Sequence, residues 1–95
     1  MSPSVEHAER DHRGAFFVEQ EGARVAEMTY TRVSETLVII DHTDVASSLA
    51  GQGVGRRLLD AAVQWARDTH TRIIATCPFA SAQFARDPSI RDVLA

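Results

Sequence analysis

Two side chains of this sequence, His42 and Cys77, suit proton transfer or nucleophilic chemistry. An imidazole exchanges protons near neutral pH, and a thiol acts as a nucleophile or as a proton donor. Each residue also has a structural interpretation. A lone cysteine is most often a small buried hydrophobe, and Cys77 continues the face of Ile73 and Ala75. A histidine at a strand end is usually a loop residue, so the residue types alone leave both interpretations open.

The segment GQGVGRR, residues 51–57, opens a helix in an unusual way. Arg56 and Arg57 stand in the first turn, where each costs about 0.3–1 kcal/mol against the helix dipole. A glycine in the same turn costs about 1 kcal/mol relative to alanine. A bound anion would reverse the electrostatic cost, and glycines let a pyrophosphate approach the backbone. The segment therefore favours phosphate binding, and the alternative is a tight loop whose arginines face solvent.

Two familiar phosphate loops are excluded by the residues around these glycines. A P-loop needs a lysine after its last glycine, and all ten basic residues of this chain are arginines. The dinucleotide fingerprint G-x-G-x-x-G would need a third glycine where Arg56 or Leu58 stands. A phosphate loop at residues 51–57 would therefore be neither a P-loop nor a dinucleotide-binding loop.

The elements that would position these residues are strands up to residue 41, followed by a helix and a further strand. Residues 15–19, 24–33 and 36–41 predict a three-stranded antiparallel meander with glycine in its first turn. An amphipathic helix follows within residues 48–68, and residues 71–77 read as another buried strand. The last strand of the meander, the helix and this strand form a βαβ unit with parallel strands. We therefore expect an α/β (α+β) fold with a mixed sheet.

The βαβ unit brings the chemical residues to one edge of the sheet. Parallel strands place their carboxyl ends together, and ligands of open α/β sheets bind outside those ends. His42, Cys77 and the glycine-rich helix start are therefore expected to converge. A short helix near residues 79–86 and a last helical turn after Asp87 complete the predicted elements.

Composition narrows the class of protein. The chain has 95 residues and a net charge of −3, with its arginines scattered, which is unlike a nucleic-acid binder. One cysteine excludes an internal disulfide and a multi-cysteine zinc site, and no metal site is expected. Residues 1–13 predict a flexible charged tail and residues 14–95 a single domain. The lack of a long apolar run predicts a cytoplasmic protein without a signal peptide or membrane span.

The order of these elements and the segment AGQGVG, residues 50–55, resemble the GCN5-related N-acetyltransferases (GNAT superfamily). The family loop is Q/R-x-x-G-x-G/A, and Ala50 replaces the leading Q/R here. TCPF, residues 76–79, resembles the small single-domain clade that carries a cysteine-proline motif after the last strand. The similarity extends from about Gly14 to Leu94, although the usual first helices, which help to build the acceptor site, are missing.

The resemblance implies an acetyl-CoA-dependent N-acetyltransferase with His42 and Cys77 as its active-site pair. His42 would take a proton from an ammonium acceptor or from Cys77. Cys77 would either accept the acetyl group or give a proton to the departing coenzyme thiolate. The residues that the resemblance and the position of the loop assign to acetyl-CoA are Thr43, Asp44, Val45, Gly51, Gln52, Gly53, Val54, Gly55, Arg56, Arg57, Pro78, Phe79 and Phe84.

The backbone from Thr43 to Val45 is expected to pair with the pantetheine in the manner of a strand. The amine acceptor is unidentified, and a short open site suits an exposed protein side chain or a small amine. One alternative function is a non-catalytic module that binds or senses acyl-CoA. Another is a nucleotide-binding protein of unrelated chemistry, which the failed loop motifs disfavour.

Overall fold

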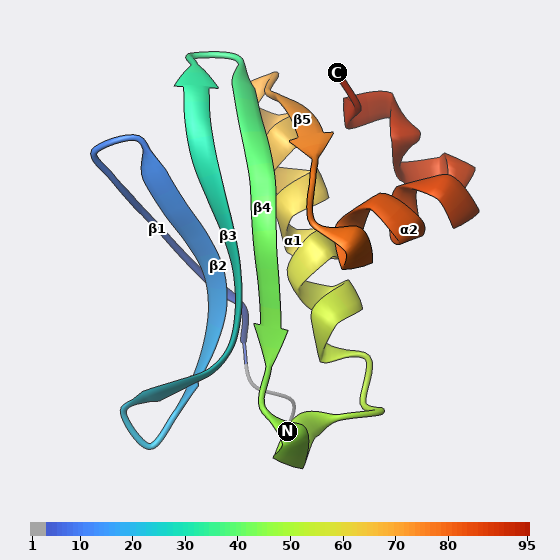
Figure 1. Cartoon of the computed structure of the whole chain (residues 1–95). Coiled ribbons are helices and arrows are strands. Elements are labelled where there is room, and N and C mark those ends of the chain that lie inside the picture. The colour runs from blue at the N-terminus through green and yellow to red at the C-terminus, as the bar shows by residue number, and fades with distance from the viewer. Residues whose placement is uncertain (1–3) are drawn as a thin grey trace.

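The computed structural model describes residues 4–95 and shows a five-stranded sheet with helices beside it (Figure 1). The strands lie in the order β1-β2-β3-β4-β5, which is also their order along the chain. Their bounds are β1 (Glu6–Arg10), β2 (Arg13–Gln20), β3 (Ala23–Ser34), β4 (Leu37–Val45) and β5 (Arg72–Ala75). The helices are α1 (Val54–Thr69), α2 (Pro78–Arg86), and the 3-10 turns η1 (Ser47–Leu49) and η2 (Pro88–Val93). The predicted α+β class with a mixed sheet is confirmed.

The βαβ unit is present as expected. β4 and β5 are parallel neighbours, paired from Leu37 with Arg72 to Ile40 with Ala75, and α1 connects them. The other pairings along the sheet are antiparallel. In the described part of the chain, no helix is long and apolar enough to span a bilayer.

The core lies between the sheet and α1. The sheet contributes Met28, Tyr30 and Ile40, each at most 2% exposed. The apolar stripe of α1 that faces them is Val54, Leu58, Leu59, Ala62, Val63 and Ala66. The positions repeat every three or four residues, which is the spacing that lays one face of a helix on a sheet.

The N-terminal segment differs from the prediction of a loose tail. Glu6–Arg10 form β1, which pairs antiparallel with β2 through a turn at Asp11 and His12, both with positive φ. Residues 1–3 of the expected tail lie outside the described residues. The charge of this segment suggested solvation, but two of its polar side chains have partners on other strands.

Those two side chains are His7 and Glu9. The His7 ring stacks on Phe16, with ring centroids 4.2 Å apart, and its Nε2 lies 2.6 Å from Tyr30 Oη. Glu9 accepts a hydrogen bond from Tyr30 Oη (2.8 Å) and pairs with both nitrogens of the Arg32 fork. Pairing of this kind offsets the desolvation of charged groups, and it fixes β1 to the sheet.

Candidate active site

β4 continues well beyond the end of β5, and the sheet opens at this point (Figure 1). The predicted strand over residues 36–41 in fact reaches Val45, while the predicted strand over 71–77 ends at Ala75. The pairing stops where the Ile40 carbonyl accepts hydrogen bonds from the backbone N–H groups of Thr76 (3.0 Å) and Cys77 (3.2 Å). The chain then turns away into α2, which leaves the edge of β4 without a neighbouring strand.

The free edge of β4 presents the backbone of Thr43 and Val45. The Ala46 N–H donates to the Val25 carbonyl (2.8 Å), so the backbone groups of Ala46 point toward β3. Backbone directions alternate along a strand, and Thr43 and Val45 therefore point their N–H and C=O groups the other way, into the gap beside β5. An extended ligand can pair with these groups as a further strand would.

A β-bulge at Asp41 decides which side chains of β4 face which side of the sheet. Ile40 pairs with Tyr30 and His42 with Thr29, so Asp41 is an extra residue on β4. In a regular strand His42 would return to the side of Ile40, which faces α1. The bulge instead places Asp41 and His42 together on the opposite, outer side of the sheet.

His42 and Cys77 are consequently not brought together. Thr43 pairs with Met28, which is buried against α1, whereas His42 pairs with Thr29 on the outer face. The convergence of the His42 imidazole and the Cys77 thiol is therefore a wrong expectation, because the bulge was not visible in the alternation of the sequence. Asp44, which was predicted to bind acetyl-CoA, pairs with Glu27 and is likewise on the outer face.

The thiol of Cys77 contacts Thr43. Cys77 is 3% exposed and stands at the N-cap of α2, directly before Pro78. Its Sγ lies 3.1 Å from Thr43 Oγ1, and either atom could donate in that hydrogen bond. The two residues reach each other because Thr43 is on the inner side of β4, where the chain leaving β5 turns into α2. The residue of β4 that reaches the thiol is therefore Thr43 and not the predicted His42.

The glycine-rich start of α1 is open. Gly51 and Gly53 have positive φ values of 79° and 72°, which glycine adopts without strain. A Cβ built on either would meet no atom within 4 Å. The first turn has no acidic residue, and no side chain caps Gly53. The first backbone bond of the helix is from Arg57 N–H to Gly53 C=O (3.1 Å), and among the described residues the N–H groups from Gly53 to Arg56 have no backbone acceptor at the positive end of the helix.

A pocket of about 410 Å³ joins this helix start to the free edge of β4. Phe79 of α2 forms part of its wall, and a Cβ on Gly55 would lie 3.0 Å from the Phe79 ring. The lining residues are Thr43, Val45, Leu49, Ala50, Gly51, Gly53, Val54, Gly55, Arg56, Phe79 and Gln83. Leu49, Ala50 and Gln83 were not predicted, because no pattern in the sequence marks an apolar or amide wall.

Some predicted residues have other roles. Arg56 joins α1 to α2, since its guanidinium contacts Asp60 (2.8 Å), Gln83 (3.0 Å) and Asp87. This arrangement raises the pKa of Arg56, mainly through the Asp87 hydrogen bond. Phe84, predicted to flank the coenzyme, is 3% exposed in the core and does not line the pocket. Phe79 and Phe84 are five positions apart in α2, so their side chains point in different directions around the helix. Phe79 faces the pocket and Phe84 does not.

Gln52, Arg57 and Pro78 lie around the pocket without lining it. Gln52 is exposed, and its Nε2 donates to the Ser48 carbonyl (3.4 Å), while Arg57 is half-buried and Pro78 is an exposed first residue of α2.

On the outer face, Asp41 is held by a polar network. Its carboxylate accepts hydrogen bonds from Thr29 Oγ1 (2.6 Å), Thr31 Oγ1 (3.0 Å) and Arg13 Nη1 (3.0 Å). Desolvation by itself would raise the pKa of Asp41, but these three hydrogen bonds together outweigh it and lower the pKa. These hydrogen bonds tie β4 to β2 and β3, and no pattern in the sequence predicted them.

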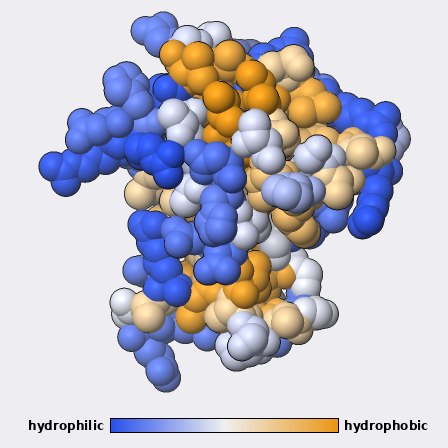
Figure 2. Space-filling view, in the orientation of Figure 1, coloured by the Kyte–Doolittle hydropathy of each residue, from blue (hydrophilic) through white to orange (hydrophobic). Residues whose placement is uncertain are grey.

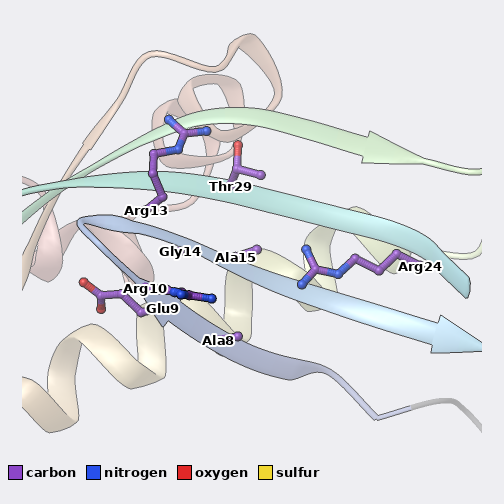
Figure 3. Close-up of a pocket in the computed structure, with 8 residues that line it drawn as sticks. All are labelled: Ala8, Glu9, Arg10, Arg13, Gly14, Ala15, Arg24 and Thr29. Atoms are coloured by element: carbon purple, nitrogen blue, oxygen red, sulfur yellow. The ribbon is translucent and has the colours of Figure 1, made fainter. Parts of the chain in front are cut away.

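A second hollow lies on the outer face of the sheet, and charged side chains surround it. It is lined by Arg10, Arg13 and Arg24 over a floor of small residues (Figure 3). Each arginine has a carboxylate neighbour: Asp11 at 3.6 Å, Asp41 at 3.0 Å and Glu27 at 3.4 Å. The hollow is therefore close to neutral. Residues 4–95 also contain no group of three or more His, Cys, Asp and Glu side chains placed to hold a metal ion.

Comparison with known proteins identifies the family. The sequence model of the GCN5-related N-acetyl-transferase family matches residues 15–93 of this chain. This protein is a GCN5-related N-acetyltransferase. The solution structure of a GCN5-like protein from Staphylococcus aureus is 37% identical, with a TM-score of 0.71 over 100% of this chain and 91% of that one. The family is one of acetyl-CoA-dependent acyltransferases, and the resemblance seen in the sequence is confirmed.

More distant acetyltransferases share the fold of this GCN5-related protein. A GNAT family acetyltransferase from Elizabethkingia anophelis, solved with acetyl-CoA bound, is 14% identical with a TM-score of 0.59. That match covers 79% of this chain and 50% of the other. An aminoglycoside N-acetyltransferase in complex with CoA is 18% identical with a TM-score of 0.56, covering 85% and 68% of the two chains. No match was found among curated proteins.

Proposed function

We propose that this protein binds acetyl-CoA in the pocket between β4, α1 and α2 and transfers the acetyl group to an amine. The observation that carries the proposal is the open start of α1. Its glycines leave space where side chains would stand, its first turn has no acid, and it borders a pocket of about 410 Å³. Binding of CoA and acetyl-CoA by structural neighbours of the same fold supports this assignment.

The residues present fit the pyrophosphate and pantetheine parts of such a ligand. The backbone amides at Gly53, Val54 and Gly55 would hold the pyrophosphate at the positive end of α1. The backbone of Thr43 and Val45 would pair with the amides of the pantetheine. Acetyl-CoA supplies an acetyl group activated as a thioester. Arg56 already pairs with Asp60 and Asp87, so the backbone is the main phosphate ligand in this proposal.

The chemistry is divided between the two faces of the sheet. His42 is exposed on the outer face, two residues beyond the end of the β4–β5 pairing, and would take a proton from an ammonium acceptor there. Cys77 is on the inner side and would give a proton to the departing thiolate. The low exposure of Cys77 favours this role over direct attack on the thioester. The acceptor amine is a small molecule or an exposed protein side chain, since the outer face of β4 is not covered by a helix.

A thermal-shift experiment tests the binding. We expect acetyl-CoA to raise the melting temperature of the wild-type protein, because a ligand that binds the native state stabilises it. Gly53→Asp places a negative charge at the pyrophosphate position and should abolish the shift. Gly22→Asp is the matched control, because Gly22 also has positive φ (80°) and open space around it, but lies in the β2–β3 turn. No shift of the wild type at millimolar acetyl-CoA would overturn the proposal.

Transfer is tested separately with a panel of amines and by intact-mass analysis. Product formation that depends on acetyl-CoA supports an enzyme, whereas binding without turnover on any amine supports the alternative of an acyl-CoA-binding module. An acetyl group that stays on the protein and disappears in Cys77→Ser would show that Cys77 is the acetyl acceptor and not the proton donor.

A further inference from the structure

Thr43 both lines the pocket and contacts the Cys77 thiol through its hydroxyl. Thr43 lines the pocket and is half-buried, whereas Cys77 is 3% exposed and is not among the lining residues. Thr43 Oγ1 is 3.1 Å from Cys77 Sγ. The hydroxyl is therefore the polar side-chain group that links the thiol to a residue of the pocket wall.

We propose that Thr43 Oγ1 relays the proton between Cys77 and the sulfur that departs in the pocket, an inference that rests on the proposed function. A hydroxyl both donates and accepts, so it can take a proton on one lone pair while it releases its own. The Cys77 S–H bond breaks as a new O–H bond forms on Thr43. The original Thr43 O–H bond breaks as the departing thiolate gains the proton, and the negative charge ends on Cys77 Sγ.

The remaining proton returns the site to its starting state. The amine nitrogen carries one proton too many after it attacks the acetyl carbonyl, and loss of that proton to Cys77 through water restores the thiol. In the net change, one N–H bond and the C–S bond of the thioester break while one C–N bond and one S–H bond form, so no further reactant is needed. With the charge on Cys77, the Thr43 hydroxyl turns and donates to the thiolate, which stabilises it between the two steps.

The neighbouring threonine is already engaged elsewhere. Thr76 Oγ1 donates to the Ile40 carbonyl at 3.2 Å, at the end of the β4–β5 pairing. The Cys77 backbone N–H donates to the same carbonyl, so this contact orients the peptide and leaves the thiol to Thr43. Among residues 4–95, the hydrogen bond to Thr43 is the one polar side-chain contact recorded for Cys77 Sγ.

Three variants separate the relay from a packing role. Thr43→Val keeps the shape and removes the hydroxyl, Thr43→Ser keeps the hydroxyl, and Thr76→Val removes a hydroxyl beside Cys77 that does not contact the thiol. We expect Thr43→Val to lower kcat by about 10²- to 10⁴-fold, which is the contribution of a positioned acid–base group. Its KM for acetyl-CoA should stay within about two-fold, because the hydroxyl acts in the transition state. Thr43→Ser should keep most of the activity, and Thr76→Val nearly all.

A second measurement needs neither an acceptor nor acetyl-CoA. Alkylation of Cys77 by iodoacetamide, followed by intact mass on the folded protein, reports how well the surroundings stabilise the thiolate. We expect alkylation to be several-fold slower in Thr43→Val and restored in Thr43→Ser. Thr43→Ala replaces Thr43→Val if the latter does not melt cooperatively.

The outcomes distinguish this inference from the proposed function. Unchanged alkylation in Thr43→Val overturns the relay whether or not the wild type turns over any amine. A raised KM with unchanged kcat also overturns it, because the hydroxyl would then serve binding alone. If acetyl-CoA does not raise the melting temperature of the wild type, the proposed function is overturned. The alkylation rates would still show whether Thr43 acts on the Cys77 thiol.

Discussion

Glycines serve opposite purposes in two regions of this protein. In the β1–β3 region, Gly14 makes room for another side chain: a Cβ there would overlap the Tyr30 ring, 2.5 Å from its Oη. In the loop before α1, a Cβ on Gly51 or Gly53 would have no atom of residues 4–95 within 4 Å. At Gly14 the missing side chain allows close packing, whereas at Gly51 and Gly53 it leaves the loop open.

The surroundings of these glycines explain the difference. Around Gly14, the Tyr30 hydroxyl contacts both His7 and Glu9, and Trp65 of α1 lies against the same ring, with centroids 5.4 Å apart. Around the α1 loop, helix amides and strand backbone lack partners within the described chain. The presence of glycine therefore does not by itself mark a binding site. The distinguishing property is whether another side chain already occupies the space of the missing Cβ.

The largest effect is expected from Gly14→Ala. The added methyl group would overlap a ring held by two hydrogen bonds and buried to 1% exposure, so the free energy of unfolding should fall by about 3 kcal/mol. Urea denaturation measures the change. The acetyl-CoA affinity of the molecules that remain folded should not change, because Gly14 is remote from the pocket. A loss below about 0.5 kcal/mol would show that Tyr30 moves easily and that the region is less tightly packed than it looks.

Acid should weaken the same region in two steps. Burial lowers the pKa of His7 below its ordinary 6.5, so the unfolded chain binds a proton first and stability falls as the pH drops below 6.5. The Arg32 hydrogen bond, helped by Tyr30, holds the pKa of Glu9 at about 2. Its contribution is therefore complete above about pH 4.5 and lost as the pH falls toward 2.

Unfolding free energies from pH 8 to pH 3 test this order. His7→Asn should flatten the upper step and Glu9→Gln the lower one. If Glu9→Gln leaves the decline below pH 4.5 unchanged, other carboxylates and not the β1 attachment carry the acid sensitivity.

The same added methyl should have a smaller and different effect in the open region. In Gly55→Ala, the Cβ would lie 3.0 Å from the half-buried Phe79 ring, and alanine also suits a helix better by about 1 kcal/mol. Stability should therefore change by less than about 1 kcal/mol. Acetyl-CoA titration should show affinity several-fold weaker, since Phe79 forms a wall of the pocket. A stability loss equal to that of Gly14→Ala would remove the contrast between the two regions.

The smallest effect is expected from Asp44→Asn. Asp44 pairs with Glu27 across the outer face, and removing one of two like charges should raise stability by about 0.3 kcal/mol. Acetyl-CoA affinity should be unchanged, because the side chain is on the opposite face from the pocket. A clear loss of affinity would mean that the coenzyme reaches around the edge of β4.

Much of the fold follows from local patterns in the sequence. The alternation in residues 24–33 and the spacing of Leu58 and Ala62 indicate burial on one face, and the continuous apolar run before Asp41 indicates a strand covered on both faces. Each of these patterns is a property of neighbours along the chain. The glycine-rich loop could be recognised as a candidate phosphate site because its glycines and arginines conflict with ordinary helix capping. The apolar surface over the adjoining parts of β4 and the edge strand β5, where Ile39 pairs with Ile74, belongs to the two apolar runs that predicted these strands (Figure 2).

The missed features depend on partners far along the chain. β1 is a strand because His7 and Glu9 meet Tyr30, more than twenty positions later. The Cys77–Thr43 contact depends on a bulge that does not interrupt the apolar pattern, since Asp41 looks like an ordinary outward residue. Phe79 and Phe84 have the same residue type, and only the docking of α2 decides which one reaches the pocket.

The bulge also makes position 41 a spacer in β4. Tyr30 pairs with Ile40 and Thr29 with His42 whether or not a residue stands between them, so deleting Asp41 would keep Thr43 inward and His42 outward. Deleting Ile39 in the regular part of the strand would instead exchange the two faces for the residues on one side of the deletion. Length variation among homologous chains should therefore be tolerated at the bulge and rare on either side of it.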